Sequence, residues 1–187
     1  MILLTLIVLA FILIVAGVAM ILFNQLRNAD ISAQEALGGI DVQLTRRADL
    51  VPNLVATVKG YASHEQGVLE NVTAARAQAA QAAQGGSVAA KAAADAALGS
   101  ALVNVLAVAE NYPDLKASAN FLDLQAQLTD TENQLSFARQ YYNDAVATLN
   151  KLVVTLPWML MAGIAGVSKR EFYQAPVAHQ APPTVSF

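Results

Sequence analysis

The sequence predicts an all-α protein in which an N-terminal transmembrane helix is followed by an antiparallel bundle of long helices. Three observations lead to this fold class. The first 26 residues carry no charged side chain. Later segments repeat apolar residues at spacings of three and four, which is the helical period. No segment of any length alternates apolar and polar residues in the manner of a strand.

The N-terminal run predicts a membrane anchor over residues 1–26. A bilayer core is about 30 Å thick and takes about 20 apolar helical residues to cross, and Met1 to Phe23 meets that length. A cleaved signal peptide has a shorter apolar stretch, of about 7–15 residues, behind a basic segment. No Lys or Arg precedes this run, and a core helix so apolar on every face is unusual. We therefore expect a retained single-pass anchor.

The charged residues near the anchor predict its orientation. Cationic residues gather on the cytoplasmic side of a span. Arg27 follows the apolar run directly, whereas only the α-amino group precedes it. We therefore expect the N-terminus outside and the rest of the chain in the cytoplasm.

A helical bundle is predicted over residues 27–156, and its clearest element is a long amphipathic helix between Asn120 and Leu152. Residues 24–50 also read as helix, which leaves open whether the anchor continues into them without a break. Pro157 is expected to end or kink the long helix. Its apolar seam follows the heptad spacing of a coiled coil through Phe121, Leu124, Leu128, Thr131, Leu135, Ala138, Tyr142, Ala145, Leu149 and Leu152.

Two further helices are predicted before the long one. The first starts near Pro52, because proline suits an early helical position but not an interior one. It runs to about Ala83, and Gly85-Gly86 ends it. Ser87 is expected to cap the next helix, which stops before Pro113.

The C-terminal region divides into a hydrophobic segment, 157–173, and a Pro-rich extended tail, 174–187. Leu152 to Ser168 carries no charge, but Pro157, Gly163 and Gly166 interrupt it. A second span and a short segment lying on the membrane or the bundle are both open. We expect the segment to contact the membrane or a neighbouring copy through Trp158, Met159 and Met161.

Composition and motifs argue against several classes of function. A net charge of −3 with no basic cluster disfavours binding to nucleic acid. The chain has no cysteine, and the HEQGV sequence around His64 is not a zinc HExxH motif. His179 stands alone in the tail. We expect no metal, no cofactor and no enzyme activity.

Glu65 is the one polar residue that invites a chemical interpretation. It lies on an otherwise apolar helical stripe, where a buried carboxylate needs a partner or a raised pKa. Arg76, Arg139 or Tyr142 could supply that partner, and a pair that fixes helix register is the main interpretation. We expect Glu65, Arg139 and Tyr142 to be buried polar residues with a structural role. A hydrolase site around Glu65 is the weaker alternative.

Several segments of the chain resemble the LemA family. They are IDVQLTRRADLVPNLVATVKGYASHE at 40–65, LENVTAARA at 69–77, AVAENYPDLKASANFLDLQAQLTDTENQLSFARQYYNDAV at 107–146 and the terminal APPTVSF. The resemblance implies an antiparallel helical bundle with an outward N-terminus in the inner (cytoplasmic) membrane of a bacterium, and no enzyme activity. Some members take part in forming internal membranes in magnetosome-making bacteria, which is a distant analogy for membrane shaping.

These observations lead to one main expectation about function and one alternative. Charged residues make up only 13% of the chain, which favours surfaces buried against a membrane or other copies. We expect a membrane-anchored scaffold whose partners are the lipid bilayer and further copies of itself. The alternative is an adaptor that presents a helical surface to another membrane protein.

Overall fold

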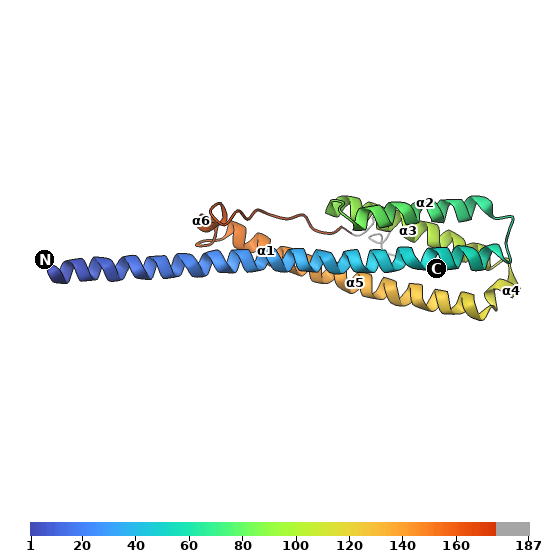
Figure 1. Ribbon diagram of the computed structural model, residues 1–187, viewed down its shortest axis with the longest axis horizontal. Coiled ribbons are helices and arrows are strands. Elements are labelled where there is room, and N and C mark those ends of the chain that lie inside the picture. The colour runs from blue at the N-terminus through green and yellow to red at the C-terminus, as the bar shows by residue number, and fades with distance from the viewer. Residues whose placement is uncertain (175–187) are drawn as a thin grey trace, which may run out of the picture. The chain divides into compact units, whose positions relative to one another are not determined.

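The structure is a computed structural model that describes residues 1–174. Every regular element in this range is a helix, which confirms the all-α prediction. In chain order (Figure 1) the helices are α1 Ile2–Lys59, α2 Gln66–Ala83, α3 Val88–Ala109, α4 Pro113–Lys116, α5 Ala119–Val154 and α6 Met159–Ala162. All but one residue of the predicted extended tail lie outside the described range.

The helices divide between two compact units. Unit 1 contains Met1–Ala36 and Tyr141–Phe172. Unit 2 contains Leu37–Gln140 together with the described residues that follow Phe172. The long helices α1 and α5 therefore contribute one part to each unit.

Helix α1 continues through Pro52, where the sequence predicts the start of a separate helix. A proline inside a helix removes the N–H that would bond the carbonyl four residues earlier. That carbonyl belongs to Ala48, and the Nε of Arg76 on α2 donates to it at 3.2 Å. The prediction of a helix start near Pro52 is wrong, because a side chain from another helix replaces the missing backbone donor.

The break after α1 comes at residues 60–65 instead. Gly60 follows the last helical residue, and glycine disfavours helix continuation by about 1 kcal/mol relative to alanine. The N–H groups of Gly60, Tyr61 and Ala62 bond back to carbonyls in the last turn of α1. Helix α2 then ends at Ala83, so its predicted end is confirmed although its predicted start is not.

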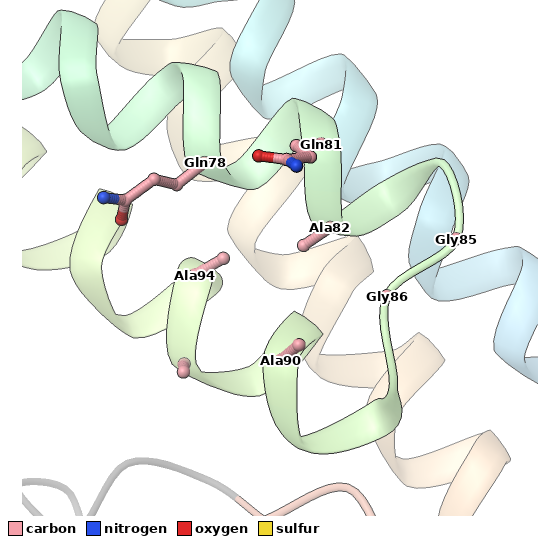
Figure 2. A pocket seen from close by; sticks show the side chains of 8 residues that line it. Gln78, Gln81, Ala82, Gly85, Gly86, Ala90 and Ala94 are labelled. Atoms are coloured by element: carbon pink, nitrogen blue, oxygen red, sulfur yellow. The ribbon is translucent and has the colours of Figure 1, made fainter.

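Helices α2 and α3 pack against each other as a hairpin whose tip contains Gly85 and Gly86. A Cβ added at Gly86 would lie 2.9 Å from the carbonyl oxygen of Ala82, so glycine is needed where the chain turns this close to α2 (Figure 2). The hydroxyl of Ser87 accepts from the N–H of Ala90 at 3.1 Å. Ser87 is thus confirmed as the N-cap of α3.

The bundle in unit 2 is antiparallel where α1 meets α5. Gln43 donates to Gln134 at 3.3 Å, and Arg46 pairs with Asp130 at 3.3 Å, so residue numbers rise along α1 as they fall along α5. Burying a large apolar side chain contributes about 1.5–3 kcal/mol, and helices α1 to α5 with the segment between α1 and α2 supply the core. Its buried members are Val51, Leu54, Val58, Ala62, Leu69, Val72, Ala75, Ala79, Leu98, Ala101, Leu102, Val105, Ala109, Leu115, Phe121 and Leu128.

The long helix predicted from residue 120 to 152 is confirmed as α5, Ala119–Val154. The predicted seam faces inward for most of its length. Thr131, a polar member of the seam, is fully buried and donates to the carbonyl of Gln127 at 2.8 Å. The other fully or nearly buried members are Phe121, Leu124, Leu128, Leu135, Tyr142 and Leu149.

Candidate functional site

A buried carboxylate on α3 gathers charged and polar side chains from several parts of unit 2. The side chain of Asp95 is 1% exposed. Its Oδ1 accepts from Nη1 of Arg47 on α1 at 2.9 Å, and its Oδ2 accepts from Arg139 on α5. The hydroxyl of Tyr173 also donates to Oδ2, at 3.1 Å. One carboxylate therefore joins three helices and the chain segment that follows α6.

A second carboxylate balances the charge of this cluster. Glu132 lies 2.9 Å from Nη1 of Arg47 and 3.3 Å from Nη1 of Arg139. Glu132 and Arg139 are seven residues apart, which places them on one face of α5 two turns from each other. The Asp95 cluster, defined as Arg47, Asp95, Glu132, Arg139 and Tyr173, thus pairs two guanidinium groups with two carboxylates.

The protonation states in the Asp95 cluster suit a structural role. Burial acts to lower the pKa of Arg139, but the charges of Asp95 and Glu132 outweigh it and raise that pKa. Burial, and then the charge of Asp95, raises the pKa of Tyr173. The ring centroid of Tyr173 also lies 5.8 Å from Cζ of Arg139, a cation–π distance. At neutral pH Arg139 is therefore charged and Tyr173 is a neutral donor, so neither serves as a titrating acid or base.

A second buried charge on α3 stabilises the hairpin. Nζ of Lys91 donates to the carbonyls of Ala82 and Ala83 at 3.1 and 3.2 Å and pairs with Asp41 on α1. Those carbonyls end α2, where the helix dipole is negative and a cation is favourable. Lys91 on α3 therefore caps the C-terminus of α2 and is paired with α1.

Sequence reasoning missed both of these α3 side chains. Lys91 and Asp95 are the only charged residues in α3 and lie four residues apart in an alanine-rich run. Two charges in an otherwise apolar helix need buried partners. That was the available signal, but the sequence does not identify the partners, which come from distant helices.

The three predicted polar candidates lie in separate interactions. Glu65 is half-buried and accepts from the hydroxyl of Tyr112 at 3.3 Å. Tyr142 is fully buried and donates to the carbonyl of Glu171 at 2.8 Å. Arg139 is half-buried in the Asp95 cluster. The predicted pairing of Glu65 with Arg139 or Tyr142 is therefore wrong, because the break after α1 puts Glu65 in a loop instead of on an interior stripe.

The described residues contain no arrangement for metal binding. Among residues 1–174, no group of three or more His, Cys, Asp or Glu side chains is placed to hold an ion. His64 is exposed, and His179 lies outside the described range. The groove beside the hairpin tip holds about 520 Å³ and is lined by alanines, two glycines, Gln78 and Gln81 (Figure 2). These side chains offer neither a charge nor a nucleophile.

Unit 1 carries a long apolar surface on α1. Each large apolar side chain from Ile2 to Ile21 is at least 49% exposed. This part of α1 is long and apolar enough to cross a membrane. Helix α3 passes the same test of length and composition, but Lys91 and Asp95 are ion-paired inside unit 2, so α3 is a bundle helix.

A second apolar surface in unit 1 lies between the end of α5 and Ile164. Of the residues predicted to make assembly or membrane contacts, Met159 is exposed, whereas Trp158 and Met161 are half-buried. The indole N–H of Trp158 donates to the side chain of Gln25 on α1, at 2.5 Å. Trp158 thus lies beside α1 just beyond the exposed apolar run.

The chain that follows this surface is fixed to both helices of unit 1. The side-chain amide of Asn150 and the backbone of Arg170 exchange two hydrogen bonds, each of 2.9 Å. Nε of Arg170 pairs with Asp30 on α1 at 2.8 Å. The segment between α5 and Arg170 therefore contacts α1 near its start, through Trp158 and Gln25, and is held at its far end by Asn150 and Asp30.

Comparison with known proteins gives a family match over most of the chain. A model of the LemA family matches residues 36–187. That range covers the bundle helices and leaves out the exposed apolar run of α1.

Magnetosome proteins from two bacteria are similar to this chain at low identity. Magnetosome proteins MamQ 1 and MamQ 2 of Paramagnetospirillum magneticum are each 24% identical to it over 194 residues, which cover 90% of this chain and 71% of the relative. Magnetosome protein MamQ of Magnetospirillum gryphiswaldense is 25% identical over 173 residues, which cover 80% of this chain and 64% of the relative.

Proposed function

We propose, from the premise that the chain belongs to the LemA family, that it is a membrane-anchored scaffold whose copies associate laterally. The observation that carries the proposal is the continuity of α1, which runs unbroken from the exposed apolar run into the bundle. The buried charged side chains of unit 2 form ion pairs between helices, and no group among the described residues suggests catalysis. The relatives' names, which place them with magnetosomes, fit a role at an organised membrane.

The outer face of α5 in unit 2 is the surface we assign to lateral association. Leu122 and Phe137 lie on the side of α5 opposite the core and are 50% and 73% exposed. Small or polar exposed residues separate them at helical spacing, namely Ala126, Thr129 and Asn133. Large exposed apolar side chains on one face favour contact with another protein surface over contact with water.

The expected test is a charge placed in this face. Phe137→Glu should leave helix content unchanged by circular dichroism, because the side chain is mostly exposed, and should dissolve the assembly of the full chain in detergent. Val103→Glu is the matched control, since Val103 on α3 is 64% exposed. Loss of assembly from Val103→Glu alone would contradict the placement on α5.

The orientation of the anchor is part of this proposal. Arg27, the first charged side chain of the sequence after the apolar run, is followed in unit 1 by Lys151, Lys169 and Arg170, and cationic residues favour the cytoplasmic side. We therefore place the N-terminus outside and the bundle in the cytoplasm of a bacterial cell. Protease added to right-side-out vesicles should leave the bundle intact, and in inverted vesicles it should cleave it.

An adaptor role is the second candidate, favoured by a groove between the end of α1 and α2. The groove holds about 680 Å³ and combines apolar Val55 and Leu69 with charged Lys59 and Glu70. Such a surface suits a segment of another protein. A chain that remains monomeric in membranes would favour this candidate over lateral association. A hydrolase built on Glu65 loses its main support, because Glu65 is half-exposed and bonded to Tyr112.

A further inference from the structure

We infer that residues 154–164, here called the interfacial segment, bind the headgroup region of the leaflet from which α1 emerges, with a preference for anionic phospholipid. The inference rests on the proposed membrane anchoring. It adds to the transmembrane span a second contact with the membrane, which lies at the bilayer surface. Its evidence lies entirely within unit 1.

The pattern of burial in the interfacial segment is the reverse of a core element. Leu156, Leu160 and Ile164 are 65%, 69% and 72% exposed. The one buried residue of the segment is the small Ala162, while Trp158 and Met161 are half-buried. A core segment buries most of its large apolar residues. The segment therefore presents its large side chains to something outside the chain.

The depth of the interfacial segment matches the edge of a bilayer. Ile2 to Phe23 spans about 33 Å at about 1.5 Å per residue, close to the bilayer core of about 30 Å. Gln25 lies two residues beyond Phe23, at the start of the polar region, and it accepts the indole N–H of Trp158. Tryptophan is the residue that favours this apolar-to-wet boundary. The contact thus holds the interfacial segment at headgroup depth.

The charges around the interfacial segment fit an anionic surface. Lys151 and Lys169 flank it in sequence and are both exposed. Arg27 lies four residues, about one helical turn, after Phe23, where the N-terminal apolar run ends, and 43% of its side chain is exposed. An apolar centre bordered by cations is the pattern of a segment lying in the plane of an anionic membrane.

The occupant we commit to is lipid, because Trp158 contacts α1 at Gln25, two residues beyond the apolar run that ends at Phe23. A second copy of the chain would also cover apolar residues. Binding to a second copy, however, does not explain why a tryptophan and several cations lie just beyond the end of the membrane span. The two occupants differ in how the environment of Trp158 responds to dilution with lipid.

The test uses Trp158, which is the only tryptophan of the chain. The full chain is reconstituted in phosphatidylcholine vesicles, with and without phosphatidylglycerol, that contain lipids brominated either near the headgroup or near the end of the acyl chain. We expect quenching of Trp158 mainly by the shallow bromine, with more quenching when phosphatidylglycerol is present. This quenching should persist as the protein is diluted with lipid.

Three results would overturn the inference. Quenching mainly by the deep bromine would mean that the segment spans the bilayer. An unquenched tryptophan would mean that the segment faces water or protein. Quenching that disappears, or a blue-shifted emission that is lost, on dilution with lipid would assign the surface to a second copy.

Matched variants separate this inference from the proposed anchoring. Leu156→Ser with Leu160→Ser and Ile164→Ser should abolish the shallow quenching while the chain still floats with vesicles through α1. Val42→Ser with Val103→Ser removes exposed apolar groups from unit 2 and should leave the quenching unchanged. Lys151→Gln with Lys169→Gln should remove the effect of phosphatidylglycerol. Failure of the wild-type chain to float would contradict the anchoring itself.

Discussion

Asp95 balances charge between helices, because two guanidinium groups and a tyrosine hydroxyl converge on its carboxylate. Removing one partner of a buried ion pair leaves the other partner buried without compensation. We expect Asp95→Ala to lower the free energy of unfolding by about 3–5 kcal/mol. Denaturant titration of the detergent-solubilised chain, followed by circular dichroism, measures this change.

Asp123→Ala is the control for the same loss of charge at the surface. Asp123 is exposed on α5 and accepts only from Gln127, one turn away. Its removal should change the free energy of unfolding by no more than about 0.5 kcal/mol. Equal small effects from the two substitutions would mean that the Asp95 cluster contributes nothing to stability.

Tyr173 gives the cluster a predicted pH dependence. Burial, followed by the charge of Asp95, raises its pKa above the usual value of 10.0. The unfolded chain therefore loses this proton first as the pH rises. The contribution of Tyr173 to stability is complete below about pH 10 and is lost as the pH rises through the folded-state pKa.

A pH series of denaturant titrations tests this sign. The free energy of unfolding should fall more steeply above about pH 10 in the wild-type chain than in Tyr173→Phe, which has no proton to lose there. Parallel slopes in the two proteins would show that the hydroxyl of Tyr173 is not held by the cluster.

At the scale of elements, the unbroken course of α1 depends on one side chain of α2. Arg76 supplies the donor that Pro52 cannot give to the carbonyl of Ala48. We expect Arg76→Met to cost about 1–3 kcal/mol of unfolding free energy, because a part-buried acceptor is left unsatisfied. In a Pro52→Ala background, residue 52 regains its backbone N–H. Arg76→Met should then lower the free energy of unfolding by less than it does in the wild-type chain.

The double-mutant cycle measures this coupling by denaturant titration. An equal cost of Arg76→Met in both backgrounds would contradict the idea that Arg76 compensates for Pro52. The single change Pro52→Ala serves as the control for any general effect of removing proline.

The elements divide into those that local sequence determines and those that it does not. The seam of α5, the end of α2 and the cap at Ser87 follow from periodicity and from capping chemistry within a few residues. The course of α1 past Pro52 depends on Arg76, which is distant in sequence. A local pattern cannot show that donor, and the interpretation of proline as a helix start fails for this reason.

The same distinction applies to the polar residues. In the sequence, Glu65 lies on an apolar stripe only if one continuous helix runs through it. The break at residues 60–65 means that no such helix exists, so Glu65 does not lie on that stripe. Lys91 and Asp95 are visible in the sequence as isolated charges in α3. Their partners Asp41, Arg47 and Arg139 lie on other helices, so the ion pairs emerge only when the bundle is assembled.

At the scale of the whole molecule, the apolar surfaces of the described chain have no partner within it. The exposed run of α1 and the interfacial segment belong to unit 1, and the outer face of α5 with Phe137 belongs to unit 2. We assign the first two to lipid and the third to another copy. The central claim is therefore that copies of the chain associate in the plane of the membrane.

Native mass measurement of the full chain in lipid nanodiscs or mild detergent tests this claim most directly. We predict a discrete species whose protein mass is a multiple of the 19.7 kDa chain, and a shift to the single-chain mass in Phe137→Glu. A wild-type protein that remains at the mass of one chain at every concentration and lipid ratio would contradict lateral association.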